Sequence, residues 1–137
     1  MFTLKDYIGV HWDSPDWTDV RIANAQALIT ACTKLQTILE NSGVHFPINP
    51  KTGTTISGEI YGGFRPQSCP IGASGSAHKQ GMAVDRYDPS NLIDGWLIAH
   101  PDVLEECGIY IEAPDFTPHW SHWSTRRPNS GKNIFIP

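Results

Sequence analysis

The sequence contains little cysteine and little positive charge. Its three cysteines, Cys32, Cys69 and Cys107, are odd in number and form no C-x-x-C pair, so we expect neither a disulfide framework nor a thiolate zinc site. Ten Lys and Arg residues against 14 Asp and Glu residues give a formal net charge of −4, and the only adjacent basic pair is Arg126-Arg127. This balance argues against nucleic acid or an anionic membrane surface as the main partner.

Long apolar runs are also missing. No stretch approaches the roughly 20 apolar residues of a membrane span, and Met1–Asp6 lacks the basic and apolar regions of a signal peptide. We therefore expect cytoplasmic synthesis without a signal peptide. With 39% apolar and 18% charged residues, the chain has the composition of a globular protein. Its 137 residues fit one domain spanning 1–137, and we expect a monomer.

Two stretches have the apolar spacing of amphipathic helices. The first begins at Ser14 as N-cap, continues with Pro15 at the first helical position and ends near Gly43. The second covers 90–108, and Pro101 is expected to break it into two segments. These stretches predict helices that bury one face each.

Short segments between glycine- and proline-rich loops have strand character. They are 58–65, 82–84 with Asp85 closing the strand, 109–112, 120–124 and 133–136. The loops between them include 45–57 and 66–77. Helices and strands that do not alternate regularly predict an α+β fold.

Three residues with metal-binding side chains stand out. His78 and Asp85 lie seven residues apart, and a third ligand is available from His119 or His122 in the strand-like segment that follows. Because that segment presents successive side chains to opposite faces, at most one of these two histidines is expected to bind. If His78, Asp85 and His122 converge, the fourth tetrahedral position is left to water, as in a catalytic zinc site.

The same residues carry a family resemblance. The segment S-x-H-x-x-G-x-A-x-D at 76–85, followed by W-x-H at 120–122, resembles the ligand signature of peptidase family M15, the D-Ala-D-Ala carboxypeptidase and dipeptidase family. Upstream, Y-G-G-F-R-P at 61–66 looks like the family's S-G-Y/F-R-P segment, whose arginine binds and polarises the substrate; here this is Arg65. The segments 3–7, 87–89 and 127–131 look like a compact phage and prophage branch, so the resemblance covers nearly the whole chain.

The resemblance implies an activity and a fold. The activity would be zinc-dependent hydrolysis of a peptide bond in bacterial peptidoglycan, with the peptide stem as the partner and zinc as the cofactor. The fold would be a small antiparallel sheet that carries the zinc ligands, with helices packed against it. Such an enzyme would act on the cell wall after release or as part of a phage particle. Which bond it cuts stays open.

The chain departs from the family pattern at the general base. Better-known members have Glu or Asp three residues before the last histidine ligand, where this chain has His119. His119 could replace it, since imidazole titrates near neutral pH. Glu112 is an alternative, because strands 109–112 and 120–124 could pair and bring it beside His122; Asp115 is a weaker candidate. If none serves, the chain would be a non-catalytic zinc-containing wall-binding or virion module.

Other residues near the signature have a less specific interpretation. Trp120 and Trp123 flank the proposed metal strand and could line a cleft. Arg126 and Arg127 could recognise a substrate carboxylate by paired hydrogen bonds, but an exposed basic pair at a turn is usually solvated surface. We therefore leave both arginines out of the predicted site.

Overall fold

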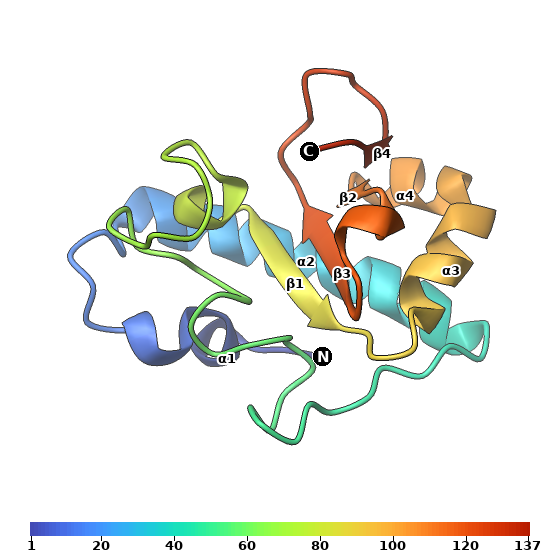
Figure 1. The fold of residues 1–137 in the computed structure, drawn as a ribbon, viewed down its shortest axis with the longest axis horizontal. Coiled ribbons are helices and arrows are strands. Elements are labelled where there is room, and N and C mark those ends of the chain that lie inside the picture. The colour runs from blue at the N-terminus through green and yellow to red at the C-terminus, as the bar shows by residue number, and fades with distance from the viewer.

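The computed structural model describes residues 1–137 as four helices and one four-stranded sheet, which is an α+β arrangement as predicted (Figure 1). The helices are α1 (Leu4–Ile8), α2 (Asp19–Asn41), α3 (Leu92–Ala99) and α4 (Pro101–Cys107), and short 3-10 helices cover Gly9–His11, Ala77–Gln80 and Pro114–Phe116. The strands are β1 (Ala83–Tyr87), β2 (Tyr110–Glu112), β3 (Trp120–Ser124) and β4 (Ile134–Phe135).

The sheet has the strand order β1-β3-β2-β4. Strand β3 pairs with β1 and with β2 in antiparallel register, whereas β4 pairs with β2 in parallel. The prediction of an antiparallel sheet is therefore wrong for β4, and the sheet is mixed. The segment between β3 and β4 returns the chain so that β4 runs parallel to β2. Asn133 and Phe135 accept backbone hydrogen bonds from Ile111 in β2 and from Ala113, which follows it.

The second predicted helix is confirmed in detail. It is split at Pro101 into α3 and α4, and Gly108 ends α4 in the left-handed conformation that favours glycine. The first helix begins later than predicted, at Asp19, because Ser14 caps a turn instead: its hydroxyl accepts from the Asp16 amide. That N-cap prediction is wrong.

Helix α1 was not predicted, although it has a recognisable start. The Thr3 hydroxyl accepts from the Asp6 amide and the Asp6 carboxylate accepts from the Thr3 amide, which is a capping box. The neighbouring segment 58–65 is not a strand, contrary to prediction. That segment turns, donates from Phe64 to the Tyr7 carbonyl at the end of α1, and accepts from Asp85 at Gly62.

The core lies between α2 and the sheet, with α2 running behind the strands in Figure 1. One face of α2 contributes Leu28, Cys32, Leu35 and Leu39, all fully buried, and the sheet contributes Val84, Ile111 and Trp123. Because strand side chains alternate, the residues next to these in sequence face the opposite side of the sheet.

One charged side chain is buried in this core. Arg86 is fully buried, its guanidinium donates to Gln36, and it lies 4.7–5.0 Å from the ring centres of Phe2, Phe46 and Trp123. Burial lowers the pKa of Arg86 to about 10. The aromatic faces therefore supply the electrostatic contact that a carboxylate would otherwise provide.

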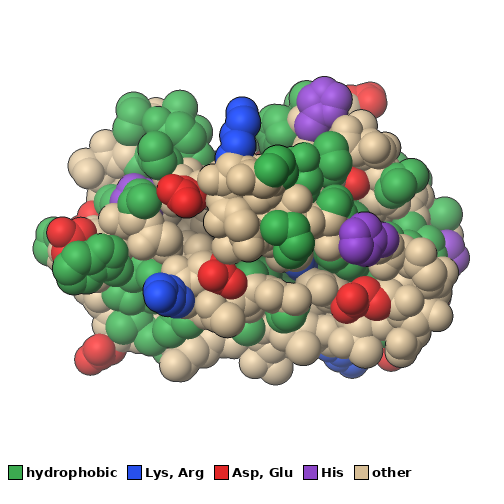
Figure 2. Space-filling model, turned by 90° about the horizontal axis from the view of Figure 1, so that it is seen from below, with side chains coloured by type: hydrophobic (Ala, Val, Ile, Leu, Met, Phe, Trp, Pro, Cys, Tyr) green, Lys and Arg blue, Asp and Glu red, His purple; other side chains and the backbone are tan.

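One face of the molecule shows how its basic side chains are distributed, and the helices can be compared with the requirements for a membrane span. Lys and Arg side chains are few and separate on the face seen in Figure 2, where no basic patch forms. None of the helices combines the length and hydropathy needed to cross a bilayer.

Gly63 has no room for a side chain. A Cβ built there would lie 2.0 Å from the Tyr7 carbonyl oxygen, whereas one built on Gly75 would meet no heavy atom within 4 Å. We expect Gly63→Ala to lower the free energy of unfolding by about 2 kcal/mol or more, and Gly75→Ala to change it by less than about 0.5 kcal/mol. Chemical denaturation measures both, and equal stability of the two variants would contradict the close packing of 58–65 on α1.

Candidate metal centre

Two of the three expected ligands are brought together by the pairing of β1 and β3. Asp85 lies directly opposite His122 in the antiparallel register. Their sequence neighbours Val84 and Trp123 point into the core, so Asp85 and His122 share the other face of the sheet. Asp85 is in the middle of β1 and does not close it, which corrects the predicted strand end.

The third residue comes from the turn before β1. His78 lies in the 3-10 helix Ala77–Gln80, and Gly81 ends that helix with a φ of 75°. A Cβ on Gly81 would lie 2.6 Å from the Arg21 carbonyl oxygen on α2. Only glycine combines this conformation with this approach, so Gly81 allows the chain to turn from His78 into β1.

The three side chains converge on one point. Oδ1 of Asp85 lies 3.2 Å from Nε2 of His78 and 2.9 Å from Nδ1 of His122. One ligand atom from each residue lies within 4.8 Å of the others, and all three residues are buried. The group selected from the sequence can therefore hold a metal ion.

Hydrogen bonds determine which imidazole nitrogens face this point. Nδ1 of His78 lies 2.8 Å from the Gly63 carbonyl oxygen and therefore donates its proton there. This leaves Nε2, which faces Asp85, as the nitrogen that would bind a metal ion once it carries no proton. His122 presents Nδ1 to Asp85. A divalent cation among these atoms would replace the proton that this nitrogen otherwise donates to the carboxylate.

The electrostatics keep Asp85 ionised. Burial alone would raise its pKa, but His78 and His122 outweigh burial and hold the pKa well below its usual range. Burial likewise opposes protonation of His122, but the hydrogen bond and charge of Asp85, together with Glu112, raise its pKa. Asp85 is therefore available as an anionic ligand for a metal ion.

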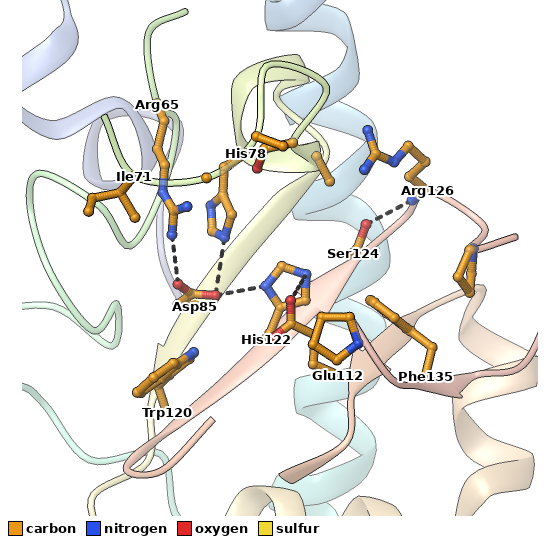
Figure 3. Close-up of a pocket in the computed structure, with 16 residues that line it drawn as sticks. Arg65, Ile71, His78, Asp85, Glu112, Trp120, His122, Ser124, Arg126 and Phe135 are labelled. Carbon is orange, nitrogen blue, oxygen red and sulfur yellow. Dashed lines mark hydrogen bonds and ion pairs between the residues drawn. The ribbon is translucent and has the colours of Figure 1, made fainter. Parts of the chain in front are cut away.

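Arg65 completes the surroundings of Asp85. Its Nη2 lies 3.3 Å from Oδ2 of Asp85, and its Nε donates to the Tyr61 carbonyl oxygen at 2.8 Å. The two oxygens of Asp85 are thus divided between Arg65 and the histidines, as Figure 3 shows. The arginine selected from the sequence lies beside the ligand group.

The ligand group lies in the wall of a pocket of about 530 Å³ (Figure 3). Arg65, Glu112 and Trp120 also line it. The remaining lining residues are Ile71, Gly72, Ala73, Ser76, Ala77, Ser124, Arg126, Pro128, Phe135 and Pro137. A metal ion held by the three ligands would therefore be accessible from the pocket.

Glu112 reaches the pocket from the neighbouring strand. The β2–β3 register pairs Tyr110 with Ser124 and Ile111 with Trp123, so the next step brings Glu112 opposite His122. Its Oε1 lies 3.9 Å from Nε2 of His122, and the side chain is 23% exposed. The strand pairing expected from the sequence thus brings this carboxylate to the ligand group.

His119 lies elsewhere. It has a φ of 74°, it is exposed, and its Nδ1 lies 3.1 Å from the Pro89 carbonyl oxygen. It precedes β3 and does not line the pocket, and neither does the exposed Asp115. His119 and His122 therefore do not share a site, as strand alternation predicted, although His119 precedes the strand and has a left-handed backbone.

Some pocket residues were missed by sequence reasoning. Arg126 lines the pocket although the sequence interpretation treated it as solvated surface, while Arg127 does not line it. Ser124 could have been found, because it lies two positions after His122 on the same strand face. Of the two tryptophans, Trp120 lines the pocket and Trp123 is fully buried in the core.

No protein-family model, curated protein or solved structure matches this chain. The functional argument therefore depends on the side chains of the site and on the motifs in the sequence.

Replacement of a residue in the ligand group should weaken metal binding, whereas replacement of a histidine outside it should not. Asp85→Asn keeps the size of the side chain but removes its charge, so we expect the affinity for Zn²⁺ to fall by more than about a hundredfold. His45→Ala, at an exposed histidine outside the pocket, should leave the affinity unchanged. Isothermal titration calorimetry with Zn²⁺ measures both, and equal affinities would contradict the assignment.

Proposed function

We propose that this chain is a zinc-dependent peptidase that hydrolyses peptide bonds in the peptide stem of bacterial peptidoglycan. One observation carries the proposal: the buried group of His78, Asp85 and His122 faces a pocket that also contains Glu112 and Arg65. A purely structural zinc site is normally closed by four protein ligands, whereas a catalytic site has three and remains open.

The donor set fits zinc. Two imidazole nitrogens and one carboxylate oxygen match the nitrogen and oxygen ligands of hydrolytic zinc sites. His78 would bind through Nε2 and His122 through Nδ1, the nitrogens that face Asp85. When bound, zinc would polarise a peptide carbonyl and lower the pKa of a water molecule toward neutrality.

Glu112 is the general base in this proposal. Its carboxylate lines the pocket beside His122 and is partly exposed, so it can meet a water molecule and a substrate. It would take the proton of the attacking water and return it to the departing amine. His119 faces the Pro89 carbonyl, and its side chain does not line the pocket.

Arg65 would stabilise negative charge on the substrate. Its contacts with Tyr61 and Asp85 hold the guanidinium in one orientation at the pocket wall. A preorganised cation of this kind stabilises charge that develops on a carbonyl oxygen, because it needs no rearrangement during the reaction. This role agrees with the one that the family resemblance implies.

The substrate class is supported by the sequence motifs. The segments 61–66, 76–85 and 120–122 resemble those of a family that acts on peptidoglycan peptides. The structure brings all three segments to one pocket, since Arg65, His78, Asp85 and His122 line it together. We therefore propose action on the cell wall after release or as part of a phage particle.

Hydrolysis is tested on purified sacculi with the zinc-loaded chain. We expect release of peptides, identified by mass spectrometry, that stops on addition of a chelator and resumes with added Zn²⁺. Binding to sacculi without any peptide release would contradict the peptidase and favour a non-catalytic wall-binding module.

Replacement of Glu112 tests the general base. Glu112→Gln should lower kcat by about 10²–10⁴-fold, while the zinc content stays that of the unsubstituted chain. Asp115→Asn makes the same chemical change at an exposed carboxylate outside the pocket and should leave kcat unchanged. If His119→Ala abolished turnover and Glu112→Gln did not, the assignment would be reversed.

A further inference from the structure

Arg126 lines the pocket and makes two hydrogen bonds, one through its backbone and one through its side chain. Its backbone amide donates to Oγ of Ser124 at 3.0 Å, and its Nη1 donates to the Gly75 carbonyl oxygen. Ser124 ends β3, and Gly75 belongs to the loop before His78. The side chain therefore spans from the sheet to that loop, which limits its freedom although it is exposed.

The guanidinium has hydrogen-bonding capacity left. A guanidinium carries five N–H donors, and the Gly75 carbonyl is the one acceptor that meets them. No carboxylate of the protein forms an ion pair with Arg126, whereas Arg65 is paired with Asp85. Arg126 is thus the pocket's unpaired cation.

The two arginines lie on different sides of the ligand group. Figure 3 shows Arg65 beside Asp85 and Arg126 at the far side, above Ser124, with His78 and His122 between them. Phe135 lines the pocket on the Arg126 side. A peptide lying across the metal ligands would therefore meet an unpaired positive charge only on one side of its scissile bond.

We propose that Arg126 is a substrate-binding residue that recognises a carboxylate of the peptide on that side. This inference rests on the proposed function for the identity of the peptide. The planar guanidinium suits a carboxylate, which can accept two parallel hydrogen bonds from it. The carboxylate is either the C-terminal group of the stem or the free α-carboxyl group of its γ-linked D-glutamate, and the two sources are separable by amidation.

The test uses binding without turnover. The zinc-loaded chain carrying Glu112→Gln is titrated with a synthetic stem pentapeptide in three forms: unmodified, amidated at the C-terminus, and amidated at the D-glutamate α-carboxyl. We expect one amidation to weaken binding about three- to tenfold, the range for a partly exposed charge-assisted contact. Adding Arg126→Met should weaken binding of the unmodified peptide equally and abolish the difference between the forms.

Matched variants distinguish recognition of the peptide carboxylate by Arg126 from support of the loop that contains Gly75. Arg127→Met removes the same charge from the adjacent exposed residue, which does not line the pocket, and should preserve discrimination between the forms. Arg126→Lys should restore part of it, because the charge is kept. The Arg126→Met variant could instead bind all three peptide forms more weakly and still distinguish them. That result would overturn the proposal and give Arg126 only a structural role in supporting the loop.

The remaining outcomes distinguish this inference from the peptidase proposal. In one outcome, the chain distinguishes the peptide forms through Arg126 but does not hydrolyse the peptide when Glu112 is intact. This result supports carboxylate recognition and overturns the peptidase proposal. Hydrolysis without discrimination overturns carboxylate recognition alone. If no form of the peptide binds, Arg126 recognises no stem carboxylate and the inference fails.

Discussion

The site depends on one backbone constraint, the antiparallel register between β1 and β3. This register puts Asp85 opposite His122, and a shift by one residue would turn one of them into the core and bring a core residue to the pocket. The core opposes such a shift, because Val84 and Trp123 fill it from the intervening positions. Hydrophobic packing on one face of the sheet thus specifies the ligand geometry on the other.

The partners of Asp85 explain how a buried carboxylate is tolerated. An ionised group taken out of water is costly unless it is paired and hydrogen-bonded. Asp85 is surrounded by His78 and His122 on one oxygen and by Arg65 on the other, and these partners come from three separate segments of the chain. Removing one partner would leave charge uncompensated, so the segments are held in place by the electrostatics as well as by packing. A divalent cation at the same point would take over the role of the proton shared by His122 and Asp85.

The parts of the fold that follow local rules were predictable. Pro101 and Gly108 delimit α3 and α4 through their own backbone preferences. Alternation over 119–122 allowed at most one of His119 and His122 to be selected. The parts decided by tertiary contacts were not. The segment 58–65 was expected to form a strand, but it makes one backbone hydrogen bond to α1 and one to β1 instead of a ladder. The parallel pairing of β4 with β2 depends on the path of the chain between β3 and β4. At the site, His78 and Asp85 were predictable from residue type and spacing, and the choice of His122 came from the family resemblance. The place of Arg126 depends on a loop that approaches it in space.

The proposed position of the general base follows from sheet geometry. In the resembled family the base precedes the last ligand by three residues on the same segment, and here that residue, His119, faces away. Side chains directly opposite each other on paired antiparallel strands have Cβ atoms about 4.5–5.5 Å apart, which is as close as neighbours on one segment. A carboxylate at Glu112 can therefore occupy the space beside His122 without any change in the ligands. The proposed mechanism needs a carboxylate close to the ligand group, and a residue on the neighbouring strand can supply it as well as one on the ligand's own segment.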